Sequence, residues 1–99
     1  MTLDKLNISL LCATVSDGGS GCSETVYWTT LDLDTWELRY FCTHWSDEHD
    51  MPLPSVFDSE AEMNEDIGFS LKYGASFWMI DREYADFYHR MINESLQYL

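Results

Sequence analysis

The chain has 99 residues, of which 18 are acidic and 5 are basic, and its formal net charge is -13 at pH 7. Its hydrophobic fraction of 45% and aromatic fraction of 15% exclude an acidic disordered tail, because such tails carry too little apolar surface to offset the entropy of ordering. We therefore predict one folded domain over residues 1–99. The uncharged stretch 6–16 is too short and too polar to span a bilayer, and no net basic segment precedes it. We expect a cytoplasmic protein.

The first half of the chain has the two-residue period of β-strands. A first strand over residues 6–15 would place Leu6, Ile8, Leu10 and Cys12 on one face and Asn7, Ser9, Leu11 and Ala13 on the other. Glycines between residues 17 and 21 would let the chain turn back into a second strand, which is rich in β-branched and aromatic residues over 24–33. A third strand over 36–45 would turn Trp36, Leu38, Tyr40 and Cys42 to the same side. These strands predict a meander.

Residues 46–57 interrupt the alternation. The segment begins with a polar run, and Pro52 and Pro54 each lack a backbone N–H and favour extended backbone in the residue before them. We expect a loop here that leads from the sheet to the helices.

Helical signals begin at Ser59. The tetrad Ser59-Glu-Ala-Glu62 matches a capping box, apolar residues follow at Met63, Ile67 and Leu71, and Gly74 stands where a helix commonly ends. An alternative makes residues 69–73 a strand.

The last segment spaces its apolar residues by three or four from Phe77 to Leu96, which predicts a second helix. Alternatively, residues 76–80 form a fourth strand and this helix begins near Asp81 or Glu83. The predicted fold class is α+β. It has a three- to four-stranded antiparallel sheet, a meander, with one or two C-terminal helices packed on its apolar face.

The acidic residues gather in the middle of the chain. Between Tyr40 and Leu71 there is no lysine or arginine. Eight carboxylates lie in this stretch: Asp47, Glu48, Asp50, Asp58, Glu60, Glu62, Glu65 and Asp66. A helix capped by Ser59 would turn Glu62, Glu65 and Asp66 to solvent, at spacings comparable with those of phosphates in DNA. Charge of one sign, uncompensated, favours a basic partner surface.

Other site chemistry has weaker support. Cys42 and His44, with His49 and Asp50 nearby and Cys12 or Cys22 brought in by the sheet, offer ligands that zinc accepts, but no Cys-x-x-Cys or His-x-x-x-His pair supports them. An acidic neighbourhood disfavours the thiolate that a nucleophilic Cys42 would need. We therefore predict no enzyme activity, no metal and no cofactor. The aromatic residues, including Trp28, Trp36, Trp78 and the Tyr84–Tyr88 group, are expected mainly in the core.

In size, acidity and mixed α+β pattern, the chain resembles two broad groups of small proteins. One comprises phage-encoded inhibitors of host defence, including anti-CRISPR and anti-restriction proteins, some of which mimic DNA. The other comprises acidic immunity proteins that occupy the basic active sites of nuclease toxins. The resemblance is compositional, and it assigns no residue.

The leading hypothesis is a viral, non-enzymatic inhibitor that acts in the host cytoplasm and blocks a nucleic-acid-binding host defence protein. Its partner would present a basic protein surface, with no direct contact to nucleic acid or membrane. The predicted partner-binding residues are Trp45, Asp47, Glu48, Asp50, Asp58, Glu62, Glu65 and Asp66, with Trp45 as an aromatic anchor. The alternatives are an immunity protein for a nuclease toxin and a self-associating assembly protein, for instance a homodimer.

Overall fold

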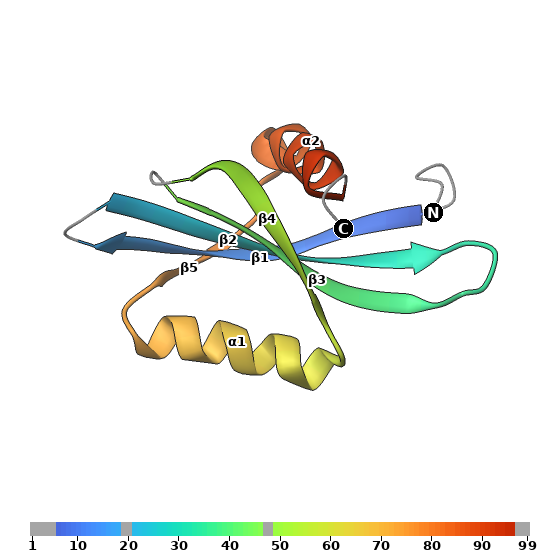
Figure 1. Cartoon of the computed structure of the whole chain (residues 1–99), viewed down its shortest axis with the longest axis horizontal. Helices are drawn as coiled ribbons and strands as arrows, with labels where there is room; N and C mark the ends of the chain where they lie inside the picture. The colour runs from blue at the N-terminus through green and yellow to red at the C-terminus, as the bar shows by residue number, and fades with distance from the viewer. Residues whose placement is uncertain (1–5, 19–20, 47–48, 97–99) are drawn as a thin grey trace.

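A computed structural model describes residues 6–18, 21–46 and 49–96. Five antiparallel strands form one sheet in the order β4-β3-β2-β1-β5, with helix α1 on one face and helix α2 on the other (Figure 1). The elements are β1 (Leu6–Gly18), β2 (Gly21–Asp32), β3 (Leu38–Ser46), β4 (His49–Phe57), α1 (Glu60–Lys72), β5 (Ser76–Met79), the 3-10 helix η2 (Arg82–Tyr84) and α2 (Ala85–Leu96). The predicted α+β class and meander are confirmed, and the sheet has five strands instead of three or four. Within the described part of the chain, neither α1 nor α2 is long and apolar enough to cross a membrane.

Strand β4 replaces the loop that was expected over residues 46–57. Among the described strands it lies at one edge of the sheet and pairs with β3 alone, so its outer side needs no backbone donors there. Proline is tolerated at such an edge because a missing N–H there breaks no ladder hydrogen bond. Pro52 and Pro54 therefore indicated an edge strand, not the end of the sheet.

A β-bulge in β1 changes which side chains share a face. The pairing with β2 shifts between Leu10 and Cys12, which leaves Leu11 as the extra residue. Ile8 and Leu10 pack on one side of the sheet, whereas Cys12 packs on the other. The predicted row from Leu6 through Cys12 on a single face is therefore wrong at Cys12.

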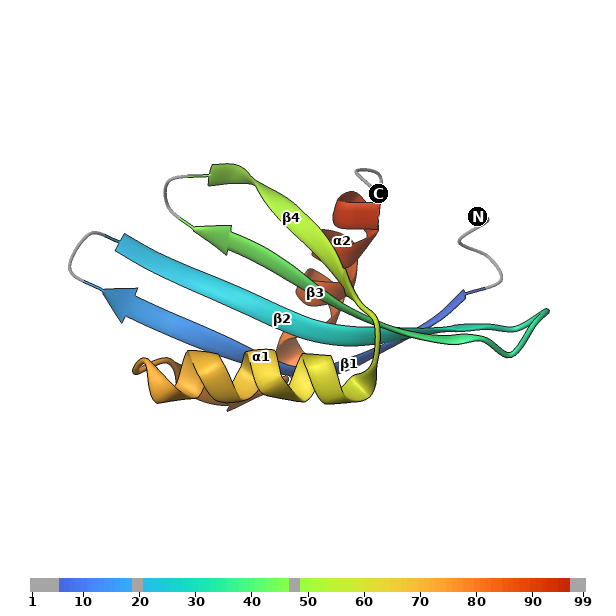
Figure 2. The same cartoon turned by 60° about the horizontal axis from the view of Figure 1, so that its bottom comes forward.

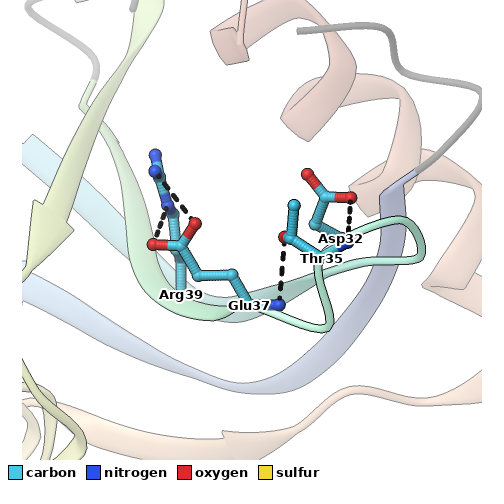
Figure 3. A network of polar contacts seen from close by, with 4 residues as sticks. All are labelled: Asp32, Thr35, Glu37 and Arg39. Carbon is cyan, nitrogen blue, oxygen red and sulfur yellow. Dashed lines mark hydrogen bonds and ion pairs between the residues drawn. The ribbon is translucent and has the colours of Figure 1, made fainter.

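The turn between β2 and β3 removes Trp36 from the strand that was predicted to contain it. Asp32 Oδ1 accepts a hydrogen bond from the N–H of Asp34 at 2.8 Å. It also accepts one from the N–H of Thr35 at 3.3 Å, and Thr35 Oγ1 accepts one from the N–H of Glu37 (Figure 3). Trp36 has a φ of 61°, in the left-handed region. Its side chain is 72% exposed, because the turn carries it beyond either helix.

Helix α1 begins and ends with the predicted capping groups. Ser59 Oγ accepts from the N–H of Glu62 at 3.2 Å. At the other end Gly74 has a φ of 96°, and the N–H groups of Gly74 and Ala75 donate to the carbonyls of Leu71 and Ser70. These two bonds form a Schellman motif. The alternative strand over residues 69–73 is wrong.

The alternative for the last segment is confirmed: residues 76–79 form β5, and α2 begins only at Ala85. β5 pairs with β1, and this pairing keeps Phe77 and Trp78 in extended backbone. The spacing of Phe77 from the apolar residues after it had predicted a helix. Asp81 caps the short η2 helix that leads into α2.

The two helices do not form the single layer that was expected; they cover opposite faces, as Figure 2 also shows. On the α2 face, Trp28 stacks on Phe41 with ring centroids 4.5 Å apart, and Ile92 packs against them. On the α1 face, Met63 packs with Tyr27, Cys12 and Cys42. Since the central strands are covered on both sides, their side chains are buried at consecutive positions, as at residues 26–30.

A chain of buried hydrogen bonds joins the sheet to α2. Trp28 Nε1 donates to Thr43 Oγ1 at 2.9 Å, and Thr43 Oγ1 lies 3.1 Å from Ser95 Oγ. The Ser95 hydroxyl donates to the carbonyl of Ile92, so the Thr43 hydroxyl is the donor to Ser95. Each buried polar group thus has a partner, which avoids the cost of an unsatisfied donor or acceptor.

Candidate functional site

Five of the eight predicted partner-binding residues lie on β3, β4 or α1, and Asp58 lies just before α1; half of the eight have described side chains. Asp47 and Glu48 lie outside the described residues. Trp45 lies in β3 opposite Glu24, and Asp50 lies in β4, but their side chains are outside the described part. The role of Trp45 as an anchor therefore stays a prediction.

The start of α1 carries the described carboxylates of the site. Asp58, Glu60, Glu62 and Glu65 are all exposed. In the segments 6–18, 21–46 and 49–96, none of these four carboxylates lies within ion-pair distance of a lysine, arginine or histidine. We call these four residues the α1 acidic surface. Glu60 was not among the predicted binding residues, although its place in the first turn of the predicted helix indicated an exposed carboxylate.

Glu62 has a structural role as well as a charge. Its Oε2 accepts a hydrogen bond from the N–H of Asp58 at 2.9 Å, while its own N–H donates to Ser59 Oγ. The side chain therefore closes the capping box one residue earlier than the Ser59 N–H that such a glutamate usually reaches. The bond fixes the position of one carboxylate, and carboxylates near a helix N-terminus are also favoured by the helix dipole.

Asp66 is half-buried and turned toward the sheet, where the sequence predicted a side chain facing solvent; its predicted part in partner binding stays a prediction. The hydroxyl of Tyr27, which is fully buried, donates to Asp66 Oδ2 at 2.7 Å. Residues Met63, Asp66, Ile67 and Ser70 are the buried or half-buried positions of α1, whereas Leu71 is 40% exposed. The face against the sheet thus follows the i, i+3, i+4, i+7 positions rather than a strict spacing of four, and this turns Asp66 inward.

Cys12 and Cys42 are buried thiols, whereas the side chains of Cys22, His49 and Asp50, the other candidate ligands, lie outside the described part of the chain. Burial, followed by the nearby Asp66 carboxylate, raises the pKa of the Cys42 thiol to about 12, and burial also raises the pKa of Cys12. Both are free thiols. His44 Nδ1 lies 2.8 Å from Thr25 Oγ1. No three His, Cys, Asp or Glu side chains among the described residues are grouped to hold a metal.

The aromatic residues form a second exposed surface, where mainly core residues were expected. Trp28 is fully buried, but Trp78, Tyr84 and Phe87 are exposed by 57%, 58% and 55%. Trp78 lies on β5, the last strand at one edge of the sheet, so neither helix covers it fully. A pocket of about 240 Å³ opens between β5 and the start of α2.

Similarity searches against family models, curated proteins and solved structures give no match to this chain. The site is therefore interpreted from its own geometry.

Proposed function

We propose that this chain is a non-enzymatic binding protein that uses the α1 acidic surface to block a basic, nucleic-acid-binding surface of another protein. The observation that carries the proposal is that Glu60, Glu62 and Glu65 are exposed on a helix with both ends capped and Asp58 is exposed just before its N-cap, without a described cation beside them. Such a surface attracts lysine and arginine side chains over a range set by the ionic strength. An anti-CRISPR or anti-restriction inhibitor and an immunity protein would both work in this way.

Rigidity supports a specific partner over mere solubility. Helix α1 packs on the sheet through Met63 and Ile67, and its N-terminus is fixed by the Ser59 and Glu62 hydrogen bonds. A helix that is already held in place loses little backbone freedom on binding, and the Glu62 side chain is also fixed, so less of the electrostatic attraction is offset by ordering.

The test compares two triple variants that each remove three negative charges. Glu60→Gln, Glu62→Gln and Glu65→Gln neutralise the acidic surface, and glutamine at 62 keeps a capping oxygen. Glu83→Gln, Asp86→Asn and Glu94→Gln neutralise three exposed carboxylates on η2 and α2. The wild-type chain, attached to a resin, would capture its partner from a lysate of the cells that produce it, and the affinity of the purified partner would then be measured.

The first variant should bind about tenfold more weakly, since exposed ion pairs contribute roughly 0.2–1 kcal/mol each. The second should bind within about threefold of wild type, and binding of the wild type should weaken as salt is added. Equal losses in the two variants would show that only net charge matters. That result would contradict a role for the α1 acidic surface.

A second candidate function is self-association through β5. All four residues of this strand are exposed, and its outer edge has no partner strand in the described sheet. Two copies could pair their β5 edges antiparallel around a twofold axis. Phe77, Trp78, Met79, Tyr84, Phe87 and Tyr73 are 49–71% exposed. At roughly 150–250 Å² per large side chain, they expose on the order of 600 Å² per copy over both faces of this edge, below the about 800 Å² per partner of a standard interface.

Analytical ultracentrifugation separates this candidate from the first. A dimer that persists in high salt, and that Met79→Lys converts to monomer, would favour self-association, because lysine on an edge strand opposes pairing. A monomer at all concentrations tested would exclude it.

A further inference from the structure

The pocket beside β5 has the composition of a cation site. Six of the residues that line it are Ala13 on β1, Trp78 and Ile80 at β5, Asp81, and Tyr84 and Tyr88 at the start of α2. Among the described residues of the lining, Asp81 is the charged one. Three aromatic side chains and one carboxylate thus share a pocket on the face of the sheet that carries α2.

The aromatic walls are held by the fold. The hydroxyl of Tyr88 donates to Glu24 Oε1 at 2.5 Å, so β2 fixes the position of that ring. Tyr84 lies four residues earlier, one helical turn away on the same side. Trp78 is opposite Ala13 in the β1–β5 pairing, which places both residues on the same face of the sheet. Phe87 is not a lining residue, but its ring contacts the Tyr88 ring edge-on, with the ring centroids 5.6 Å apart.

The charges around the pocket are unevenly placed. Asp81 Oδ1 accepts from the N–H of Arg82 at 2.9 Å, which fixes the carboxylate at the start of η2. Glu24 adds a second carboxylate behind Tyr88. The Arg82 side chain is exposed and is not among the lining residues, so the charged residue of the described lining is acidic.

We propose that this pocket binds the guanidinium group of an arginine side chain from a partner protein. Cations are attracted to the faces of tryptophan and tyrosine rings. Guanidinium is planar and weakly hydrated, stacks on such rings and pairs with a carboxylate, which favours arginine over lysine. A volume of about 240 Å³ is below the roughly 300–1,000 Å³ of pockets for drug-sized molecules, and therefore suits one side chain.

The pocket and the α1 acidic surface lie on opposite faces of the sheet, so the inference goes beyond the proposed function and does not depend on it. Arginine could bind here even if the acidic surface of α1 had no partner. Likewise, the α1 acidic surface could bind a partner even if the pocket bound no arginine.

The test is an NMR titration of the isotopically labelled chain with N-acetyl-arginine amide. The indole N–H signal of Trp78 should shift on addition, with Kd in the millimolar range, while the signal of the exposed Trp36 stays in place. N-acetyl-citrulline amide is a neutral analogue of the same shape and should bind about tenfold more weakly, and N-acetyl-lysine amide should bind more weakly than the arginine compound.

Variants then assign the binding to the pocket. Asp81→Asn keeps a capping oxygen for η2 and removes the charge, so it should weaken arginine binding roughly threefold to tenfold without unfolding the chain. Trp78→Leu removes the indole reporter, so its binding is followed by the backbone N–H signal of Tyr84, and it should weaken binding about tenfold. The matched control Trp36→Leu should leave binding unchanged. Equal binding of the arginine and citrulline compounds, or unchanged binding in both pocket variants, would overturn the proposal. Tighter binding of the lysine compound would overturn the preference for arginine.

Discussion

The two faces of the sheet are covered by helices of similar length in different ways. Helix α2 lies over a large aromatic core, in which Trp28, Phe41 and Ile92 are almost fully buried. Helix α1 covers a smaller core around Met63 and adds a polar contact, the hydrogen bond between Tyr27 and Asp66. The difference indicates that the α2 face contributes most of the apolar stabilisation, and that the α1 face also holds a carboxylate in place beside the acidic surface.

Replacement of Trp28 should give the largest effect. Trp28→Ala removes a fully buried ring, its stacking on Phe41 and its bond to Thr43, and should cost about 3–5 kcal/mol in the free energy of unfolding. Urea unfolding followed by circular dichroism measures the loss. Trp36→Ala, at an exposed tryptophan, is the matched control and should change stability by less than about 0.5 kcal/mol. Similar losses at the two sites would contradict the assigned core.

On the α1 face, Asp66→Ala should cost about 1.5–3 kcal/mol, because the Tyr27 hydroxyl loses a charged acceptor while the ring stays buried. Tyr27→Phe combined with Asp66→Ala should cost less than the sum of the two single losses, since the double variant leaves no unpaired group. Unfolding in urea gives the three values. Additive losses would show that the two side chains do not interact.

The raised pKa of the Cys42 thiol should make the free energy of unfolding fall at alkaline pH. Its pKa rises from an ordinary 9.0 to about 12 in the fold, because of burial and the Asp66 carboxylate. Above pH 9 the unfolded chain therefore releases a proton that the folded chain keeps, and stability falls by about 1.4 kcal/mol per pH unit for that proton until pH approaches the folded value. Between pH 10 and 11, where the unfolded thiol is almost fully ionised and the folded one is still protonated, Cys42→Ala should reduce the slope of the unfolding free energy against pH by about this amount. Parallel slopes for both proteins would contradict the prediction.

The α1 cap gives the smallest of these effects. Ser59→Ala removes the acceptor for the Glu62 N–H and should cost about 1 kcal/mol, whereas Ser59→Asp keeps an acceptor and should cost less. Thermal unfolding compares the two variants. If Ser59→Ala binds the partner as tightly as wild type, a fixed helix N-terminus is not needed for binding.

Local patterns were enough to predict the meander and the first helix. The residues from Glu24 to Leu31 have a composition typical of strands, and Ser59, Glu62 and Gly74 formed the caps that the sequence indicated. Strand composition and helix caps depend on residues that are close together in the sequence.

Features that depend on distant parts of the chain were missed. Strand β4 can contain prolines because, in the described sheet, it has a neighbour on one side alone, and the bulge at Leu11 becomes visible only in the pairing with β2. The inward position of Asp66 depends on Tyr27, 39 residues away. For the same reason the pocket beside Trp78 could not be predicted, since β1, β5 and α2 each contribute to it.

The central claim is that the α1 acidic surface occupies the place of nucleic acid on its partner. Its most direct test is a competition measurement with the purified partner and its labelled nucleic acid, monitored by fluorescence anisotropy. We predict that the wild-type chain displaces the nucleic acid with rising concentration, and that the Glu60→Gln, Glu62→Gln, Glu65→Gln variant needs about tenfold more protein for the same displacement. Binding of the chain and the nucleic acid to the partner at the same time would contradict the account.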